Sequence, residues 1–409
     1  MRTHTRLVHY DPCPGDPWRP NTTPLYQTAT FAGVSASESG VYDYTRSGNP
    51  TRDLLQRQVA DLEGGGEGFA FSSGMAAIAA VTRLCQAGEH IICGRDIYGG
   101  TFRWLDSCAP RLGLEVTAID AGDPEALAKA LRPETRLVMV ETPTNPLQEI
   151  NDIEALAEVS RAHGAWFVVD GTLMSPYLQR PLDLGADVVL HSATKHLSGH
   201  GDCTAGVVVT RDAAIAERLA FQQNAEGTGL APFESWLLLR GMKTLGVRLD
   251  REQVSAGRVA EFLSVHPLVT RVYYPGLEEH PGADVHRRQA RGAGSLISFT
   301  TGDLKCSRRV VEETRLFTIS VSFGSTSSSI SLPACMSHAS IPEEVRKTRA
   351  LPGDLVRLSI GLEDPEDLIE DLARSLDEDA SPHSKAWQRG QSQSGSIHAS
   401  MPAPPSTET

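Results

Sequence analysis

The sequence predicts an α/β protein built on a mostly parallel sheet, followed by a smaller α+β domain. Short apolar strands alternate with amphipathic helices from about residue 67 to residue 195, a rhythm typical of α/β domains. After about residue 250 this alternation stops, and strands and helices follow one another less regularly. The chain has 409 residues, more than one small core requires, which favours two or three domains.

Composition and charge exclude several classes of protein. The hydrophobic fraction of 40% and the charged fraction of 22% are ordinary for a soluble globular protein. A net charge of -13 argues against a general nucleic-acid binder, which needs a basic face. The N-terminus has no apolar signal core, and no apolar run reaches the length that spans a membrane. We therefore expect a cytoplasmic protein with no nucleic-acid and no membrane partner.

The cysteines indicate a reducing compartment. There are seven, an odd number, and none forms a C-x-x-C pair. Cysteines and histidines do not cluster at the spacing of metal ligands, so we expect no metal site.

Residues 1–60 are expected to form an extended N-terminal arm. Within it, "PLYQTATF" at 24–31 is strand-like, and the following "YDYTRSGNPT" is rich in turn residues. Asn49 and Pro50 fit the start of a helix, because "RDLLQRQVADLEGG" then has apolar residues at helical spacing.

Residues 61–250 are expected to form the large domain and residues 251–378 the small one. The large domain begins with a strand, a Ser-Ser-Gly turn and a helix in "GFAFSSGMAAIAAVTRLC". Its further strands and helices are predicted at "HIICGRD", "LEVTAID", "PEALAKAL", "RLVMVET", "IEALAEVSRAHGA", "WFVVDGT" and "DVVLHSATK". The small domain is expected to contain "VSAGRVAEFLSVH", "GSLISFT", "LVRLSIG" and "PEDLIEDLARSL". Residues 379–409 are rich in Ser, Pro, Gln and Gly and are predicted to be a disordered tail.

Three predicted strands end in chemically useful residues. One ends at Glu141 and leads to Asn145, the next ends at Asp170, and a third ends at Ser192 and leads to Lys195. In open α/β sheets, ligands bind at the carboxyl ends of the strands. A single acid at such a place is more often a structural cap. Three strand ends of this kind, together with a glycine turn at a helix start, favour a binding site.

The turn "SSGMAAI" at 72–78 is a candidate phosphate site. Gly74 permits close backbone approach, and the helix that follows offers unpaired N–H groups and the positive end of its dipole. The hydroxyl groups of Ser192 and Thr194 could reach the same phosphate. The alternatives are a turn that only starts a helix and hydroxyls that only cap their own loop.

Lys195 and Asp170 complete the pattern of a pyridoxal-phosphate site. A lysine just past a buried strand, beside phosphate ligands, can form a Schiff base with a carbonyl cofactor, although an isolated lysine is usually a solvated charge. An aspartate beside a pyridine nitrogen keeps that nitrogen protonated and strengthens the ring as an electron sink. The order of strand–Asp followed by strand–Ser-x-Thr-Lys is much more specific than either part.

Arg357 lies on the predicted strand of "DLVRLSIGLED". It is either a surface arginine or a bidentate clamp for a substrate carboxylate, and the sequence pattern leaves both open.

The chain resembles the Cys/Met-metabolism family of pyridoxal-phosphate enzymes. The resemblance runs from about residue 20 to about residue 376. It rests on "YDYTRSGNPTRDLLQ", "FSSGMAAI", "DIYGGTFR", "ETPTNPLQEINDI", "VVDGTLMSPYLQRPLDLGADVVLHSATKHLSGHGD" and "DLVRLSIGLEDPEDLIEDL". The stretches "TPLYQTATF", "QNAEGTGLAPFESWLLLRGMKT" and "VSFGS" are most similar to the plant-type cystathionine β-lyases. The resemblance implies the type I fold of pyridoxal-phosphate transferases and the cofactor pyridoxal 5'-phosphate (PLP).

The resemblance also implies a role for individual residues. The residues expected to bind the cofactor are Tyr44, Arg46, Gly74, Met75, Tyr98, Asn145, Asp170, Thr172, Ser192, Thr194 and Lys195. Lys195 and Tyr98 are expected to be catalytic, and Ser322 and Arg357 to bind the substrate carboxylate. Tyr44 and Arg46 are expected to reach the phosphate from a neighbouring subunit, which implies a homotetramer built from dimers with shared active sites.

Three positions depart from the family pattern. Gly171 replaces the usual asparagine after the aspartate, so a side-chain amide is lost beside the cofactor. Ser327 stands where γ-acting members commonly carry an acid, which disfavours γ-elimination and γ-replacement and is compatible with β-elimination. His196 replaces the usual aromatic residue after the lysine, and we interpret it as a packing variation.

The expected activity is that of a PLP-dependent carbon–sulfur β-lyase in transsulfuration and methionine biosynthesis. It would cleave L-cystathionine, a small sulfur amino acid, to homocysteine, pyruvate and ammonia. Alternatives within the family are cystathionine γ-synthase, cystathionine γ-lyase, O-acylhomoserine sulfhydrylase and a specialised cysteine-conjugate lyase. An alternative of another class is a catalytically silent PLP-binding regulatory protein.

Overall fold

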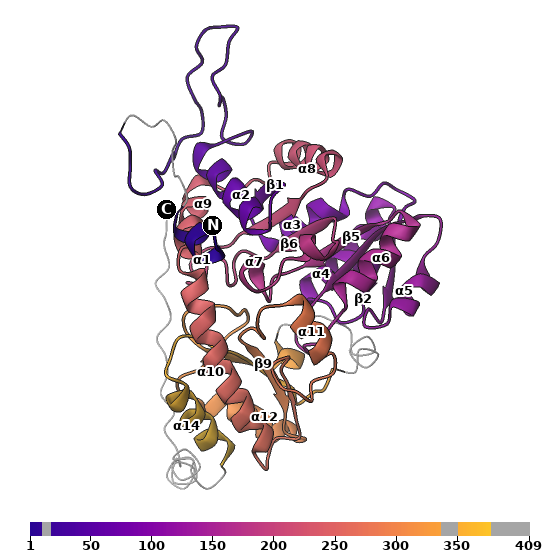
Figure 1. Ribbon diagram of the computed structural model, residues 1–409, viewed down its shortest axis with the longest axis vertical. Helices are drawn as coiled ribbons and strands as arrows, with labels where there is room; N and C mark the ends of the chain where they lie inside the picture. The colour runs from indigo at the N-terminus through magenta and orange to yellow at the C-terminus, as the bar shows by residue number, and fades with distance from the viewer. Residues whose placement is uncertain (10–17, 337–350, 378–409) are drawn as a thin grey trace, which may run out of the picture.

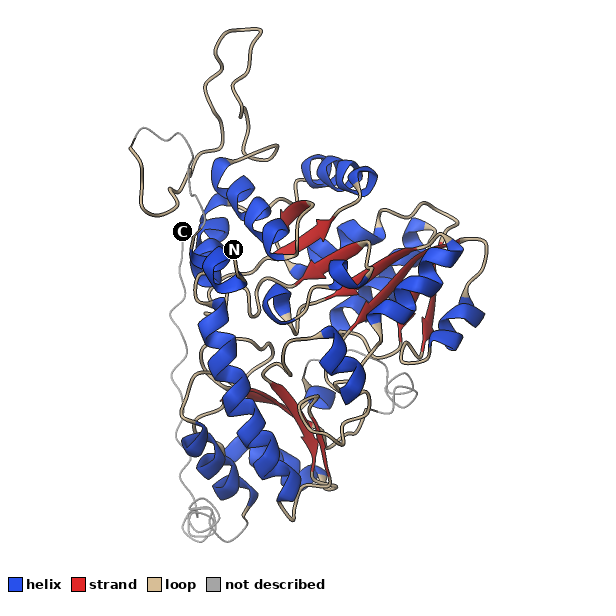
Figure 2. Cartoon of the chain, in the orientation of Figure 1, coloured by secondary structure: helices blue, strands red, loops and turns tan. Residues whose placement is uncertain are grey.

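The computed structural model of the chain describes residues 1–9, 18–336 and 351–377, and the predicted tail at 379–409 lies outside these ranges. The strands form two sheets, a large one and a smaller one, each with its own helices. The long helix α10 (Leu245–Val265) joins the two parts (Figures 1 and 2). The predicted domain division at residue 250 falls inside this helix.

The large sheet has seven strands in the order β1-β7-β6-β5-β4-β2-β3. The pairs from β6 to β3 are parallel, whereas β7 is antiparallel to both β6 and β1. The sheet is therefore mostly parallel, as the sequence predicts. Its strands are β1 (Glu67–Phe71), β2 (His90–Gly94), β3 (Glu115–Ile119), β4 (Thr135–Glu141), β5 (Trp166–Asp170), β6 (Val188–His191) and β7 (Gly206–Thr210).

Helices cover both faces of this sheet, because successive side chains of a buried strand point to opposite sides. In β4, Val138 and Val140 pack in one core cluster, whereas Leu137 and Met139 pack in another. The first face is covered by α2 (Pro50–Leu62), α6 (Ile153–His163) and α9 (Pro232–Met242), and the second by α3 (Gly74–Thr82) and α8 (Ala213–Glu226). The shorter helices of this region are α4 (Gly99–Arg103), α5 (Pro124–Ala130) and α7 (Ser175–Leu178).

The second sheet has five strands in the order β10-β11-β12-β9-β8 and forms a separate core with α10, α12 and α14. The sequence predicts only the last part of α10, from residue 254. The helix begins nine residues earlier, and the charged residues Arg248 and Glu252 are among those it buries. The remaining elements are β8 (Arg271–Tyr273), α11 (Ala283–Gln289), β9 (Leu296–Thr300), α12 (Leu304–Glu313), β10 (Thr318–Ile319), β11 (Ser329–Ser331), β12 (Val356–Ser359) and α14 (Pro365–Leu376).

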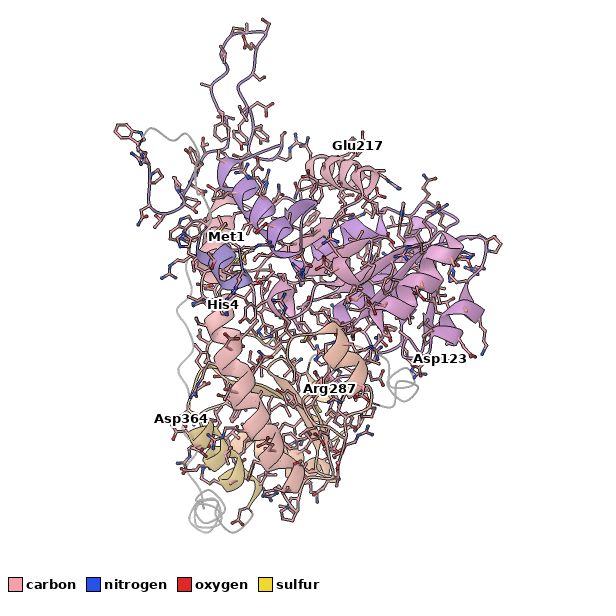
Figure 3. The ribbon with its side chains drawn as sticks, viewed as in Figure 1. Met1, His4, Asp123, Glu217, Arg287 and Asp364 are labelled. Carbon is pink, nitrogen blue, oxygen red and sulfur yellow. The ribbon has the colours of Figure 1, made fainter. Side chains whose placement is uncertain are left out.

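The N-terminal segment differs from its prediction in two ways. A short helix, α1 (Thr3–Val8), packs near the start of α10, where His4 Nε2 lies 2.8 Å from the Tyr177 hydroxyl (Figure 3 labels His4). The prediction of a strand at 24–31 is wrong, because the segment pairs only through an isolated bridge between Thr30 and Tyr44. A strand requires a continuous hydrogen-bonded neighbour, and residues 24–31 have none among the described residues of the protomer. The helix expected after Asn49 is present as α2, and the Asn49 side chain caps it.

Candidate active site

A cavity of about 430 Å³ lies at the carboxyl ends of β4, β5 and β6. This volume is within the range of small-molecule sites. Eleven of the thirteen predicted site residues line it: Gly74, Met75, Tyr98, Asn145, Asp170, Thr172, Ser192, Thr194, Lys195, Ser322 and Arg357. Tyr44 and Arg46 do not. A hollow of about 500 Å³ beside α1 has four arginines among its lining residues and contains none of the predicted residues.

The start of α3 forms one end of the cavity. Ser73 caps the helix, and its Oγ accepts a hydrogen bond of 3.1 Å from the N–H of Ala76. Gly74 and Met75 supply the first two N–H groups of the helix, which have no acceptor within it. Gly74 lies so close to Ser192 that a Cβ atom would come within 2.8 Å of the Ser192 Cβ. The predicted anion cradle is thus built from the α3 start and the loop after β6.

Lys195 extends into the cavity from the loop after β6. Its Nζ donates a 2.6 Å hydrogen bond to the Ser322 hydroxyl. The same Nζ lies 5.1 Å from the centre of the Phe323 ring, within cation–π range. Burial, followed by the nearby charge of Arg357, lowers the pKa of Lys195 to about 8. The amine is therefore poised to act as a nucleophile and a base near neutral pH.

This lowered pKa predicts how uptake of PLP depends on pH. The neutral amine gains population as pH rises through about 8, and at pH 7.5 about a quarter of it is neutral, against roughly a thousandth for an ordinary lysine. We expect the rate at which cofactor-free protein acquires the visible absorbance of bound PLP to reach half of its plateau at about pH 8 and to level off near pH 9. Stopped-flow absorbance measures this rate. A rate that keeps rising steeply beyond pH 9 would indicate an unperturbed lysine.

Asp170 ends β5 at the base of the same cavity. Its Oδ1 accepts hydrogen bonds from the backbone N–H of Thr172, at 3.0 Å, and from the Thr172 hydroxyl. Burial raises the pKa of Asp170, whereas the Thr172 hydrogen bonds and His191 act in the opposite direction. A protonated ring nitrogen would supply a cation that stabilises this buried carboxylate.

Arg357 is a buried residue of the cavity wall, so the alternative of a surface arginine is wrong. Its side chain is 3% exposed, and it donates hydrogen bonds to Asn145 Oδ1 (2.9 Å) and to the Ser322 carbonyl (2.7 Å). Burial lowers its pKa to about 10, so the guanidinium remains charged at neutral pH. Ser322 has a backbone φ of 100°, a strained conformation of the kind found at functional sites.

Tyr98 lies at the mouth of the cavity and is 40% exposed. It precedes α4, and its backbone N–H donates a 3.1 Å hydrogen bond to Glu141 Oε2. Burial raises the pKa of Glu141, with Asp170 and Asp96 adding to the effect. Glu141, at the carboxyl end of β4, therefore holds the backbone of Tyr98 in place at the cavity.

Tyr44 and Arg46 lie on the arm, away from this cavity. The Arg46 Nη1 donates a 2.8 Å hydrogen bond to the Asn224 carbonyl near the end of α8, and its guanidinium lies 5.6 Å from the centre of the Tyr44 ring. One protomer therefore does not bring these two residues to its own site.

Gly171 and Ser327 occupy different surroundings. Gly171 lies against His191, where a Cβ atom would come within 2.7 Å of the ring, and His191 forms a buried 2.6 Å contact with Glu63. The space beside Asp170 is thus filled by a histidine–glutamate pair. Ser327 is exposed and does not line the cavity.

Phe323 and Arg103 are two of the cavity-lining residues that the sequence did not assign to the site. Phe323 faces Lys195 and also Arg357, whose Cζ lies 5.6 Å from the ring centre. Arg103 lines the cavity from the end of α4. Their motifs, "VSFGS" and "DIYGGTFR", are part of the family resemblance. The sequence around each residue has no periodic pattern that would predict which way its side chain points.

The residues of the cavity fit pyridoxal 5'-phosphate. The helix start and the Ser192 hydroxyl suit the phosphate, Asp170 suits the ring nitrogen, and Lys195 suits the aldehyde. Thr194 lines the same space, but its hydroxyl caps its own loop through hydrogen bonds with the Ala205 backbone, at 3.2 Å to the carbonyl and 2.9 Å from the N–H. These donors surround one space whose volume suits a small cofactor with an amino-acid substrate.

Comparison with known proteins identifies the family. The family described as Cys/Met metabolism PLP-dependent enzyme matches residues 4–377. A chloroplastic cystathionine beta-lyase of Arabidopsis thaliana is 52% identical over 357 residues, which cover 87% of this chain and 77% of that protein. A cystathionine gamma-lyase of Bacillus subtilis is 43% identical over 92% of this chain and 100% of its own length. A crystal structure of cystathionine gamma-lyase from Lactobacillus plantarum, complexed with L-serine, has a TM-score of 0.89 and 42% identity over 92% of this chain and 98% of that chain. The chain therefore belongs to the Cys/Met metabolism family of PLP-dependent enzymes.

Proposed function

We propose that the chain is a carbon–sulfur β-lyase that cleaves L-cystathionine to homocysteine, pyruvate and ammonia. The observation that carries this proposal is the convergence of Lys195, Asp170 and Arg357 on one cavity beside a helix start. A relative with 52% identity is named cystathionine beta-lyase, which supports this substrate over other sulfur amino acids.

Arg357 and Ser322 would bind and orient the substrate carboxylate. The Arg357 guanidinium is held in place by Asn145 and by the Ser322 carbonyl, so it loses little freedom when it binds an anion. A fixed carboxylate at this wall directs the substrate Cα toward the Lys195 amine, which hydrogen-bonds to the neighbouring Ser322 hydroxyl.

Lys195 would move the proton on which the reaction depends. When bound, PLP supplies an electron sink for the negative charge that develops at Cα. Lys195, with its pKa lowered to about 8, removes the Cα proton, and the thiolate then leaves from Cβ as homocysteine. The remaining three-carbon fragment takes up water and yields pyruvate and ammonia. Tyr98, at the cavity mouth, would stack on the ring and assist proton transfer.

A second candidate is γ-cleavage of the same substrate. The relative from Bacillus subtilis that matches 92% of this chain is named cystathionine gamma-lyase. The family resemblance disfavours this candidate, because Ser327 stands where γ-acting members commonly carry an acid. The Ser327 side chain lies outside the cavity, so the reaction products decide between the two candidates.

The keto acid formed from L-cystathionine distinguishes these candidates. We expect purified PLP-loaded protein to release pyruvate and homocysteine in equal amounts, measured by chromatography of the derivatised keto acid and thiol. Release of 2-oxobutyrate with cysteine would establish γ-cleavage. A protein with normal cofactor absorbance that releases neither from any sulfur amino acid tested would be a regulatory PLP-binding protein.

We also propose that the active form is a homotetramer built from two dimers. Within each dimer, the two subunits would both contribute residues to each active site. Tyr44 and Arg46 are predicted phosphate ligands, but they do not line the cavity of the protomer to which they belong. The arm that carries them exposes large apolar side chains, as expected for a surface that packs on a second copy: Trp18, Leu25, Val34, Val41 and Tyr44.

Mixed assemblies test whether sites are shared. Arg46→Ala and Lys195→Ala proteins should each be inactive alone. After unfolding and refolding together, about half of the dimers are mixed, and each mixed dimer regains one intact site, so activity should return to about a quarter of wild type. Equal mixing without refolding is the control. No recovery in assemblies shown to be mixed would mean that Arg46 does not serve a neighbouring site.

We propose a cytoplasmic location. None of the six cysteines within the described residues forms a disulfide bond, which suits a reducing compartment. Among the described helices, none is both long and apolar enough to cross a membrane. The relative from Arabidopsis thaliana is named chloroplastic, so fractionation of the source cells is the measurement that tests this assignment.

A further inference from the structure

His196, directly after Lys195, belongs to a buried charged cluster behind the active site. Its Nδ1 lies 3.5 Å from the Glu252 Oε2 of α10, and neither side chain is exposed to solvent. The same oxygen accepts a 3.2 Å hydrogen bond from the hydroxyl of Ser295, which directly precedes β9 of the small sheet. The cluster therefore joins the lysine loop, α10 and the small sheet at one point.

Arg248 completes this cluster on the side of α10. It lies one turn before Glu252, and its Nη2 donates hydrogen bonds to the carbonyls of His196 (2.8 Å) and Gly241 (3.2 Å). Burial lowers the pKa of Arg248 and the Glu252 charge raises it. Buried carboxylates require compensating charge, so Glu252 depends on the cations and donors around it.

The other side of His196 faces the cavity wall. Its ring packs against Phe323, with the ring centres 5.8 Å apart and the planes tilted by 49°. Phe323 in turn faces both cations of the site, with Lys195 Nζ at 5.1 Å and Arg357 Cζ at 5.6 Å from its ring centre. A single aromatic ring thus separates the His196–Glu252 pair from the two groups assigned to the substrate.

We propose that the buried pair of His196 and Glu252 positions Phe323, and through it the Lys195 amine and the Arg357 guanidinium. In this proposal His196 is a positioning residue, a role that goes beyond the packing variation that the sequence indicates. An aromatic residue, usual at this position in the family, would contact Phe323 as well, but it would leave Glu252 without this partner. A displacement of about 1 Å in groups that orient a substrate can cost on the order of a hundredfold in rate, so a small rotation of Phe323 has measurable consequences.

This inference rests on the proposed function only in assigning Lys195 and Arg357 to the substrate site. Its test therefore uses glycine, an α-amino acid with no side chain to eliminate, and needs no turnover. Glycine binding is followed by the absorbance of PLP-loaded protein, and stability by the thermal unfolding midpoint.

Four proteins form the comparison: wild type, His196→Phe, Glu252→Gln and the double variant. Each single variant should weaken glycine binding by roughly fivefold to tenfold and lower the unfolding midpoint, because it leaves one buried polar group without its partner. The double variant has neither member of the pair and keeps an aromatic ring against Phe323. It should recover glycine affinity to within about twofold of wild type.

His90→Gln is the matched control. His90 is equally buried, but it starts β2 and contacts Thr135 and Thr117 at the edge of the sheet opposite the site. It should lower the unfolding midpoint without changing glycine affinity. Unchanged glycine affinity in both single variants, or a double variant no better than the weaker single one, would overturn the proposal. If Glu252→Gln does not fold, the glycine affinity of His196→Gln is measured instead. An affinity equal to that of wild type would contradict the proposal. A loss of affinity similar to that of His196→Phe would support it.

Discussion

Lys195→Ala is expected to lower the turnover of cystathionine by at least about a thousandfold, because it removes the group proposed to move the Cα proton. The visible absorbance that depends on the lysine should disappear as well. Ser322 would lose its hydrogen-bond donor, but the fold should persist, since alanine leaves the strand β6 and the loop hydrogen bond between the Lys195 N–H and the Ser192 carbonyl intact.

Lys243→Ala is the control for this variant. Lys243 follows α9 on the surface, and its loss should change neither absorbance nor turnover. Steady-state assays of keto-acid release and an absorbance spectrum of each variant provide the comparison. Substantial turnover by Lys195→Ala would remove Lys195 from the proposed chemistry.

Arg357→Ala is expected to raise the KM for cystathionine by about a hundredfold or more, because a buried carboxylate site would lose its charge-assisted hydrogen bonds. Cofactor absorbance should remain, since Lys195 and Asp170 approach the cavity from other strands. Steady-state kinetics separates the two effects, because lost substrate binding raises KM whereas lost cofactor removes activity altogether.

Two variants serve as controls for Arg357. Arg271→Ala removes an exposed arginine at the start of β8 and should leave KM unchanged. Arg357→Lys keeps the charge but not the planar fork that binds Asn145 and Ser322, so its KM should lie between wild type and Arg357→Ala. A KM for Arg357→Ala equal to that of wild type would place the substrate carboxylate elsewhere.

The residues at the strand ends could be predicted because local sequence determines them. Glu141, Asp170 and Ser192 each follow a run of apolar residues that can only be a buried strand, and parallel strands bring their carboxyl ends to one edge. The starts of the helices after Asn49 and Ser73 could also be predicted from the sequence, because in each case a capping side chain precedes the apolar face of a helix.

Other features depend on contacts between distant segments, so local sequence does not determine them. The start of α10 is obscured because Arg248 and Glu252 occupy buried positions where apolar residues are expected. The burial of Arg357 follows from Asn145 and Ser322, which are 212 and 35 residues away in the chain. The segment at 24–31 has strand composition but lacks a partner within its own protomer.

The covalent attachment site of PLP decides whether Lys195 is the residue that holds the cofactor. Borohydride reduction of PLP-loaded protein fixes the cofactor to the amine that holds it, and mass spectrometry of the digested protein then identifies that lysine. We expect a single labelled peptide that contains Lys195, together with loss of label from Asp170→Ala protein prepared at limiting cofactor. Label on a different lysine, or equal labelling of several, would contradict this assignment.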